Sequence, residues 1–181
     1  MSESSKGNSA KYRWAFGIKG LLRVTRSDIR MGTDDRVGDD ELYMQRLLAE
    51  FGPRRRSLRL HVIHREDTDN CLHDHPWAFW SVVLWGGYTE EIPAPDSTPE
   101  EAAAGYPRRV TLTVRPGTFR KMPFGYRHRI TRLLKRVSVT LAYAGPIQAE
   151  EWGFYTSSGK LTWHDFVFNE RPQRVFWCDI R

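Results

Sequence analysis

Short segments in which apolar and polar residues alternate dominate this chain from residue 57 onward. They cover residues 57–65, 79–90, 108–114, 136–144 and 161–168, and each is bounded by Gly, Pro or Asp. Alternation places successive side chains on opposite faces of a strand, as in a half-buried sheet. Many short strands separated by turns predict an all-β fold, either a sandwich or a barrel.

One segment before these strands has helical spacing instead. Residues 39–53 read DDELYMQRLLAEFGP, in which Leu42, Leu47, Leu48 and Phe51 recur at helical intervals, and Gly52 and Pro53 follow as a stop signal. We therefore expect one N-terminal helix. The predicted organisation is a disordered tail over residues 1–10, an extension carrying the helix over 11–56, and one barrel over 57–181.

Composition narrows the classes of protein that need to be considered. The chain has 181 residues, with 28 basic and 22 acidic side chains, so the net charge is 28 − 22 = +6. The basic residues are spread along the chain, and no helix-turn-helix or RNA-binding signature accompanies them, so a nucleic-acid partner is not expected. No apolar run approaches the roughly 20 residues of a membrane span. With only Cys71 and Cys178 and no CxxC pair, we expect a cytoplasmic protein.

Three histidines stand out by their spacing. His73 and His75 are two residues apart, so in an extended strand both side chains lie on one face and can reach one ion. His128 ends the pattern Gly117-x5-Pro123-x-Gly125-x2-His128, whose Gly and Pro residues turn the chain tightly. Three neutral imidazoles suit Fe, Zn, Cu or Ni and leave coordination positions open for a substrate or oxygen.

These two motifs resemble those of the cupin superfamily. The second cupin motif matches at Gly117, Pro123, Gly125 and His128, with Arg132 in place of the usual Asn. The first motif supplies His73, His75 and a later Gly86 or Gly87, but its Glu is absent, since Phe79 and Trp80 occupy the two possible places. The resemblance covers about residues 57–145. It implies a double-stranded β-helix, or jelly-roll barrel, and a three-histidine metal site like that of the thiol dioxygenase branch. It also implies a possible homodimer.

Further side chains are candidates for the same site. In a regular strand His64 shares a face with Leu58, Leu60 and Val62, whereas His61 lies on the other face. The first face is the more apolar, so we expect His64 to line the barrel and His61 to lie at the surface. Tyr88 and Glu90 lie near the end of the following strand. Either could act in catalysis, and Glu90 could hydrogen-bond a ligand histidine or accept a proton.

The resemblance points to a divalent metal ion and a small-molecule substrate, without a membrane partner. Three neutral ligands leave the ion its full charge, which favours an anionic or chelating substrate. An oxygenase using Fe(II) is the leading hypothesis. An isomerase, epimerase or lyase using Zn, Mn or Ni is the alternative, and a non-catalytic small-molecule-binding cupin is the third.

Overall fold

The structure is a computed structural model that describes residues 9–18, 22–30, 42–67, 69–96, 98, 108–149, 151–156 and 159–168. The predicted tail therefore lies almost entirely outside the described residues, and so do Cys178 and most of the acidic segment between residues 97 and 107. Strands account for nearly all regular structure, as the sequence predicted, and every strand pairing is antiparallel.

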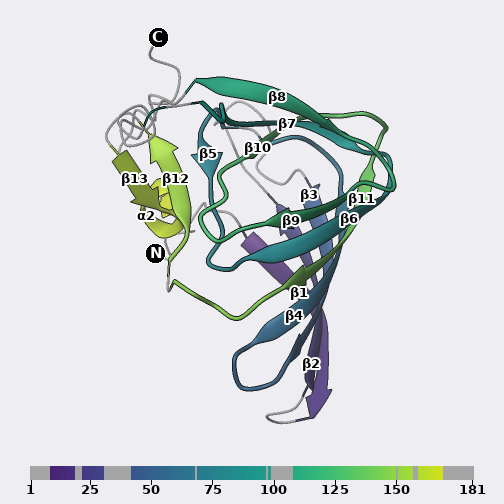
Figure 1. Cartoon of the computed structure of the whole chain (residues 1–181). Coiled ribbons are helices and arrows are strands. Elements are labelled where there is room, and N and C mark those ends of the chain that lie inside the picture. The colour runs from purple at the N-terminus through teal and green to yellow at the C-terminus, as the bar shows by residue number, and fades with distance from the viewer. Residues whose placement is uncertain are drawn as a thin grey trace, which may run out of the picture.

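A seven-stranded sheet forms the larger wall of the molecule (Figure 1). Its spatial order is β1-β2-β3-β4-β11-β6-β9. The strands are β1 (Ser9–Ile18), β2 (Leu22–Arg30), β3 (Leu42–Phe51), β4 (Arg56–Ile63), β6 (Phe79–Trp85), β9 (Phe119–Met122) and β11 (Ser138–Ala144). The first three strands come from the predicted N-terminal extension and are hydrogen-bonded into the same sheet as β4.

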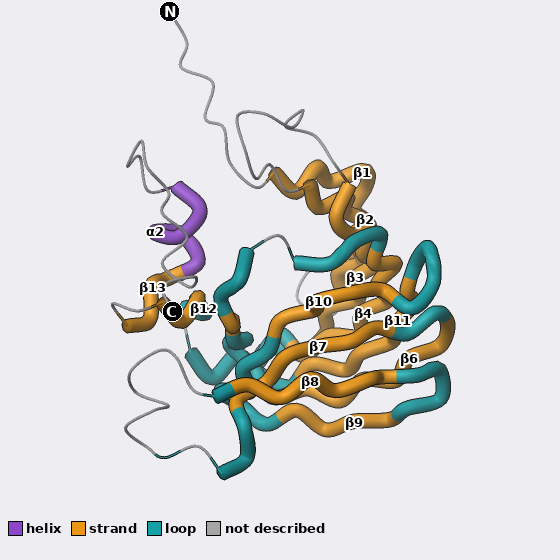
Figure 2. Tube along the Cα trace, turned by 90° about the horizontal axis from the view of Figure 1, so that it is seen from above, coloured by secondary structure: helices purple, strands orange, loops and turns teal. Residues whose placement is uncertain are grey.

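A three-stranded sheet of order β10-β7-β8 faces the larger sheet (Figure 2). It consists of β7 (Tyr88–Pro93), β8 (Arg109–Val114) and β10 (Arg129–Leu133). From β6 to β11 the chain passes back and forth between the two sheets, which is the jelly-roll arrangement. The prediction of a cupin-type jelly roll is therefore confirmed.

The β6–β7 turn shows why glycine is needed where the chain changes sheets. Gly86 has a φ of 78°, in the left-handed region, and a Cβ atom there would lie 2.1 Å from the carbonyl oxygen of Val137. No other residue type has both the backbone freedom and the missing side chain that this turn requires.

The hydrophobic core lies between the two sheets. Its buried members come from both walls and are Ile63, Val83, Tyr88, Val114 and Ile130. Met44 and Leu133 pack against this cluster from its edges.

A third, smaller sheet of order β13-β12-β5 closes one end of the molecule. It contains β5 (Leu72–His73), β12 (Gly153–Thr156) and β13 (Gly159–Thr162), and the short helix α2 (Trp163–Phe168) follows β13. The alternation predicted over 161–168 therefore ends after two strand residues. Within the described part of the chain, no helix is long and apolar enough to cross a membrane.

The predicted N-terminal helix is wrong, because residues 42–51 form strand β3. Leu42, Leu47, Leu48 and Phe51 satisfy a helical interval, but the segment forms a strand nevertheless. β2 pairs with one edge of β3 and β4 with the other, so both edges of the strand find backbone partners. This pairing overrides a weak local helical preference.

Candidate metal centre

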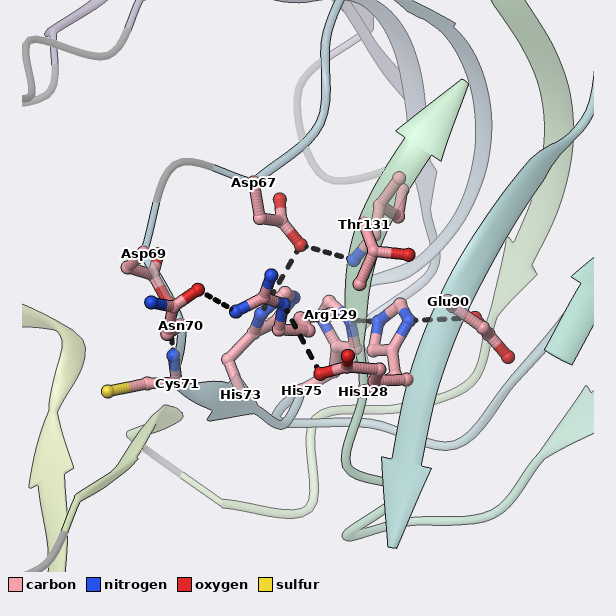
Figure 3. A network of polar contacts seen from close by, with 12 residues as sticks. Asp67, Asp69, Asn70, Cys71, His73, His75, Glu90, His128, Arg129 and Thr131 are labelled. Carbon is pink, nitrogen blue, oxygen red and sulfur yellow. Dashed lines mark hydrogen bonds and ion pairs between the residues drawn. The ribbon is translucent and has the colours of Figure 1, made fainter. Parts of the chain in front are cut away.

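Backbone pairing brings the two histidine motifs together, although 53 residues separate His75 from His128. His73 and His128 form an isolated antiparallel bridge. The His73 amide donates to the His128 carbonyl over 2.9 Å, and the reverse bond is 3.0 Å. The three imidazole rings converge beside this bridge (Figure 3).

The three rings present a compact set of nitrogen donors. One ring nitrogen from each of His73, His75 and His128 lies within 4.8 Å of the other two. The Nε2 atoms of His75 and His128 are 3.1 Å apart. Two ligands bound at right angles to one ion, each about 2.1 Å from it, would be separated by about 3 Å. The donor type and this spacing therefore fit a divalent transition-metal ion.

Glu90 orients His128 from β7, the strand that pairs with β10 directly after His128. Its Oε2 lies 3.1 Å from Nδ1 of His128, which leaves Nε2 of that ring directed toward His75. Glu90 is fully buried, and its Oε1 accepts a 2.8 Å hydrogen bond from the Tyr126 hydroxyl and an ion pair from Arg120. Burial alone would raise the pKa of Glu90, but the contacts with His128 and Arg120 outweigh it and lower the pKa to about 2. Glu90 is therefore a carboxylate at neutral pH.

A second carboxylate, Asp67, lies beside His73. Its Oδ2 is 3.9 Å from Nδ1 of His73, and this nitrogen is buried without a hydrogen bond among the described residues. Asp67 is held by the Tyr43 hydroxyl at 2.6 Å and by the Ile130 amide at 2.7 Å. Carboxylates behind ligand histidines are common in metal sites, where they fix the ring orientation.

The environment favours neutral imidazoles. Burial is the largest cause that lowers the pKa of His73, to about 4, although the nearby charge of Asp67 opposes it. Burial and the proximity of His128 lower the pKa of His75 well below its usual value. Neutral imidazoles are the form that binds a metal ion, so no proton needs to leave these two rings near pH 7.

Aromatic rings enclose His75. Trp77 and Trp152 are stacked against it with centroid separations of 6.4 and 6.3 Å, and Phe79 meets it edge-on at 5.1 Å. Trp77 and Phe79 have the same parity as His75, which places them on its side of an extended segment. Trp152 was missed, because it reaches the cluster only through the pairing of Phe154 on β12 with His73 on β5.

The structure corrects the predicted face of β4. Ile63 is only 3% exposed and Ser57 is fully buried, whereas Leu58 is 43% exposed. His61 therefore shares the inner face, and the expectation that it lies at the surface is wrong. His64 lies beyond the last residue of β4, where its Nε2 is 3.2 Å from Oε1 of Gln45 and outside the histidine cluster.

The remaining predicted site residue, Tyr88, packs in the hydrophobic core. Sequence reasoning did not connect Tyr126 with the site, and this residue meets Arg120 at Glu90. Tyr126 precedes His128 by two positions, and this spacing was the available signal for it.

The fold and the site together define a cupin-type barrel with the donor set of a divalent-metal site, in agreement with the resemblance of the sequence. No protein-family model matches the chain, and no curated protein matches it. Among solved structures, a putative mannose-6-phosphate isomerase from Ralstonia eutropha is similar over 50% of this chain and 74% of its own, with 17% identity and a TM-score of 0.39.

Two further solved structures are similar at the same level. Oxalate oxidase in complex with glycolate matches 68% of this chain and 59% of its own, with 11% identity and a TM-score of 0.44. Hydroxypropylphosphonic acid epoxidase from S. wedmorenis matches 55% and 50%, with 9% identity and a TM-score of 0.39. The activities in these names are those of the other proteins.

Proposed function

We propose that this protein is a metal-dependent cupin oxygenase that uses Fe(II), held by His73, His75 and His128, to oxidise a small anionic or chelating substrate. The observation that carries the proposal is the cluster of three imidazole nitrogens within 4.8 Å of one another, without a carboxylate among them. When bound by three such ligands, Fe(II) supplies open positions at which a substrate and oxygen can bind side by side.

The surrounding residues support this use of the cluster. Glu90 holds Nδ1 of His128 and so turns Nε2 of that ring toward its neighbour. Trp77 and Trp152 lie roughly parallel to His75 and give that side of the site an apolar wall. Of the three residues predicted to act in catalysis, we retain Glu90, as an orienting group. Three partners already occupy its oxygens, which argues against a role as the proton acceptor.

An isomerase, epimerase or lyase is the second candidate, and one observation favours it. The Tyr126 hydroxyl donates to Glu90, which contacts His128, so a chain of hydrogen-bonding groups leads away from the cluster. Such a chain could move a proton in a reaction that consumes no oxygen, with Zn, Mn or Ni polarising a carbonyl group.

The test is the metal content of the purified protein, measured by elemental analysis. We expect about one equivalent of iron in the wild-type protein and its loss in His128→Ala. His64→Ala is the matched control, since His64 lies outside the cluster, and it should retain the metal. Nitric oxide, as an oxygen surrogate, should then give a new paramagnetic signal with the iron-loaded protein.

Zinc, manganese or nickel in place of iron, with no response to nitric oxide after iron reconstitution, would favour the second candidate. No metal under any reconstitution would contradict both and leave a small-molecule-binding barrel.

A further inference from the structure

Two basic side chains lie beside the histidine cluster on the inner face of β4, and neither has a role in the site described so far. Arg59 and His61 have the same parity as buried Ser57 and Ile63, so both point into the space between the sheets. Arg46 on β3 is the register partner of His61 and brings a third basic group to this face.

Arg59 is connected to the metal centre through a single aromatic ring. Its guanidinium carbon lies 3.8 Å from the centroid of Trp77, and the other stacking partner of Trp77 is His75. The Nε of Arg59 donates a hydrogen bond to Ser57 Oγ over 2.9 Å, which also restrains the guanidinium group. The orientation of the guanidinium group is thus set before any ligand arrives.

Arg59 makes no ion pair with a carboxylate among the described residues. The carboxylate nearest in the register is Glu50, opposite Ser57, and its Oε1 accepts two hydrogen bonds from Arg55, at 2.9 and 3.2 Å. Arg59 is half-buried, so its guanidinium group loses part of its hydration, and an anionic partner would offset this cost.

The local electrostatics are consistent with a missing anion. Burial and then the charge of Arg46 lower the pKa of Arg59 to about 9, although Glu50 opposes part of this effect. Burial, then Arg46 and Arg59, lower the pKa of His61 to about 3. Like charges therefore repel one another here, and a divalent ion on the histidines would add to the positive potential.

The strand register indicates at which end of the site the anionic group of a substrate would bind. Arg59, Ala142, Ser81 and Arg120 form one row across β4, β11, β6 and β9, so only short side chains stand between the two arginines. Arg120 is already neutralised by Glu90. The uncompensated positive charge in this row is therefore at the Arg59 end.

We propose that Arg59, assisted by His61, binds an oxyanion group of the substrate, a carboxylate or a phosphate, while the reacting end of the molecule meets the histidine cluster. The planar guanidinium fork matches both groups, because either can accept two parallel N–H bonds. This inference rests on the proposed function only for the metal end of the substrate, since the anion contacts involve no metal ligand.

The test measures anion binding by thermal unfolding at constant ionic strength, with chloride replaced by acetate or by inorganic phosphate. An anion at concentration c that binds the native state stabilises it by RT ln(1 + c/Kd), so Kd is obtained from the rise of Tm with anion concentration. We expect wild-type Tm to rise with at least one of the two anions. The Kd should increase at least tenfold in Arg59→Met. Arg56→Met is the matched control, because it removes the same charge from an exposed position on the same strand.

Arg59→Lys provides a second variant should Arg59→Met fail to fold. Lysine retains the positive charge but lacks the planar guanidinium group, so a Kd between those of the wild type and Arg59→Met would support the proposal. A response to acetate alone identifies a carboxylate, and a response to phosphate alone identifies a phosphorylated substrate. Equal anion affinity in wild type, Arg59→Met and Arg59→Lys, or no response in wild type, would overturn the inference.

Metal content separates this inference from the proposed function. Arg59→Met should keep the wild-type metal content, because Arg59 is not a ligand. If the wild-type protein binds no metal but its anion response depends on Arg59, the proposed function fails and the anion site stands. If metal binds normally but the anion response is independent of Arg59, the anion site fails and the proposed function stands.

Discussion

Glu90→Gln tests the two roles of the buried Glu90 carboxylate, one in metal binding and one in the stability of the fold. Glu90 orients His128 through a 3.1 Å contact and neutralises Arg120. Glutamine keeps an acceptor for His128 but removes the charge. Loss of such an outer-shell carboxylate typically weakens metal binding by about 10- to 100-fold. We expect a decrease of that size for Glu90→Gln, measured by competition with a chromophoric chelator.

The same substitution should also destabilise the fold. Removing one member of a buried ion pair costs about 3–5 kcal/mol, because the other charge remains unpaired. The Arg120 side chain is 15% exposed, so water can partly compensate, and we expect a loss near the lower end of this range, about 3 kcal/mol, in urea unfolding. The double variant Glu90→Gln/Arg120→Met removes the unpaired charge and should lose less stability than the sum of the single variants.

Glu91→Gln is the matched control for both measurements. Glu91 is the next residue on β7, 28% exposed, and it pairs with Arg109 and Arg129 instead of a histidine. The metal affinity of the Glu91→Gln variant should match that of the wild type. A folded Glu90→Gln with metal affinity within about twofold of the wild type would refute a contribution of the Glu90 charge to metal binding, and so would an equal loss in Glu91→Gln.

Three further predictions concern stability. Tyr43→Phe removes the 2.6 Å hydrogen bond to buried Asp67 and should cost about 1–3 kcal/mol in urea unfolding; an unchanged midpoint would contradict this. Burial and then the charge of Asp67 raise the pKa of Asp69 to about 7 from an ordinary 3.8, so the cost of ionising it grows as pH rises between these values. Asp69→Asn should therefore gain Tm relative to wild type at pH 8 and not at pH 4, and a pH-independent difference would refute the assignment. Gly86→Ala should destabilise by at least about 3 kcal/mol, whereas Gly117→Ala, with a similar φ of 84° but open space around it, should cost about 1–2 kcal/mol; equal costs would mean that the clash relaxes.

The spacing of two motifs was sufficient to predict the histidine cluster. His73 and His75 share a strand face by parity, and Pro123 and Gly125 mark the turn before His128. Such local rules depend only on backbone geometry, so they survive without knowledge of the partner strands. The alternating segments after residue 57 predicted the all-β class for the same reason.

The local sequence pattern gave a wrong prediction for residues 42–51 and for the buried face of β4. The apolar residues of 42–51 recur at helical intervals, but the backbone hydrogen bonds offered by β2 and β4 selected the strand. On β4 the more apolar face turned outward, because the inner face carries Ser57, Arg59 and His61 toward the site. Hydrophobicity indicates the buried face only where the interior is apolar, and the part of the interior beside the histidine cluster is polar.

By itself, the sequence determined the strand-rich class and the shared face of His73 and His75, because both follow from residue periodicity along a single segment. His128 was joined to them through the resemblance of the two motifs to those of cupins. Only the tertiary structure decided which residues surround them. Trp152 reaches the cluster through β12, Glu90 reaches His128 from β7, and Arg59 faces it from β4. These contacts join segments that are distant along the chain, and their register is set by hydrogen bonds between strands and by packing of the two sheets.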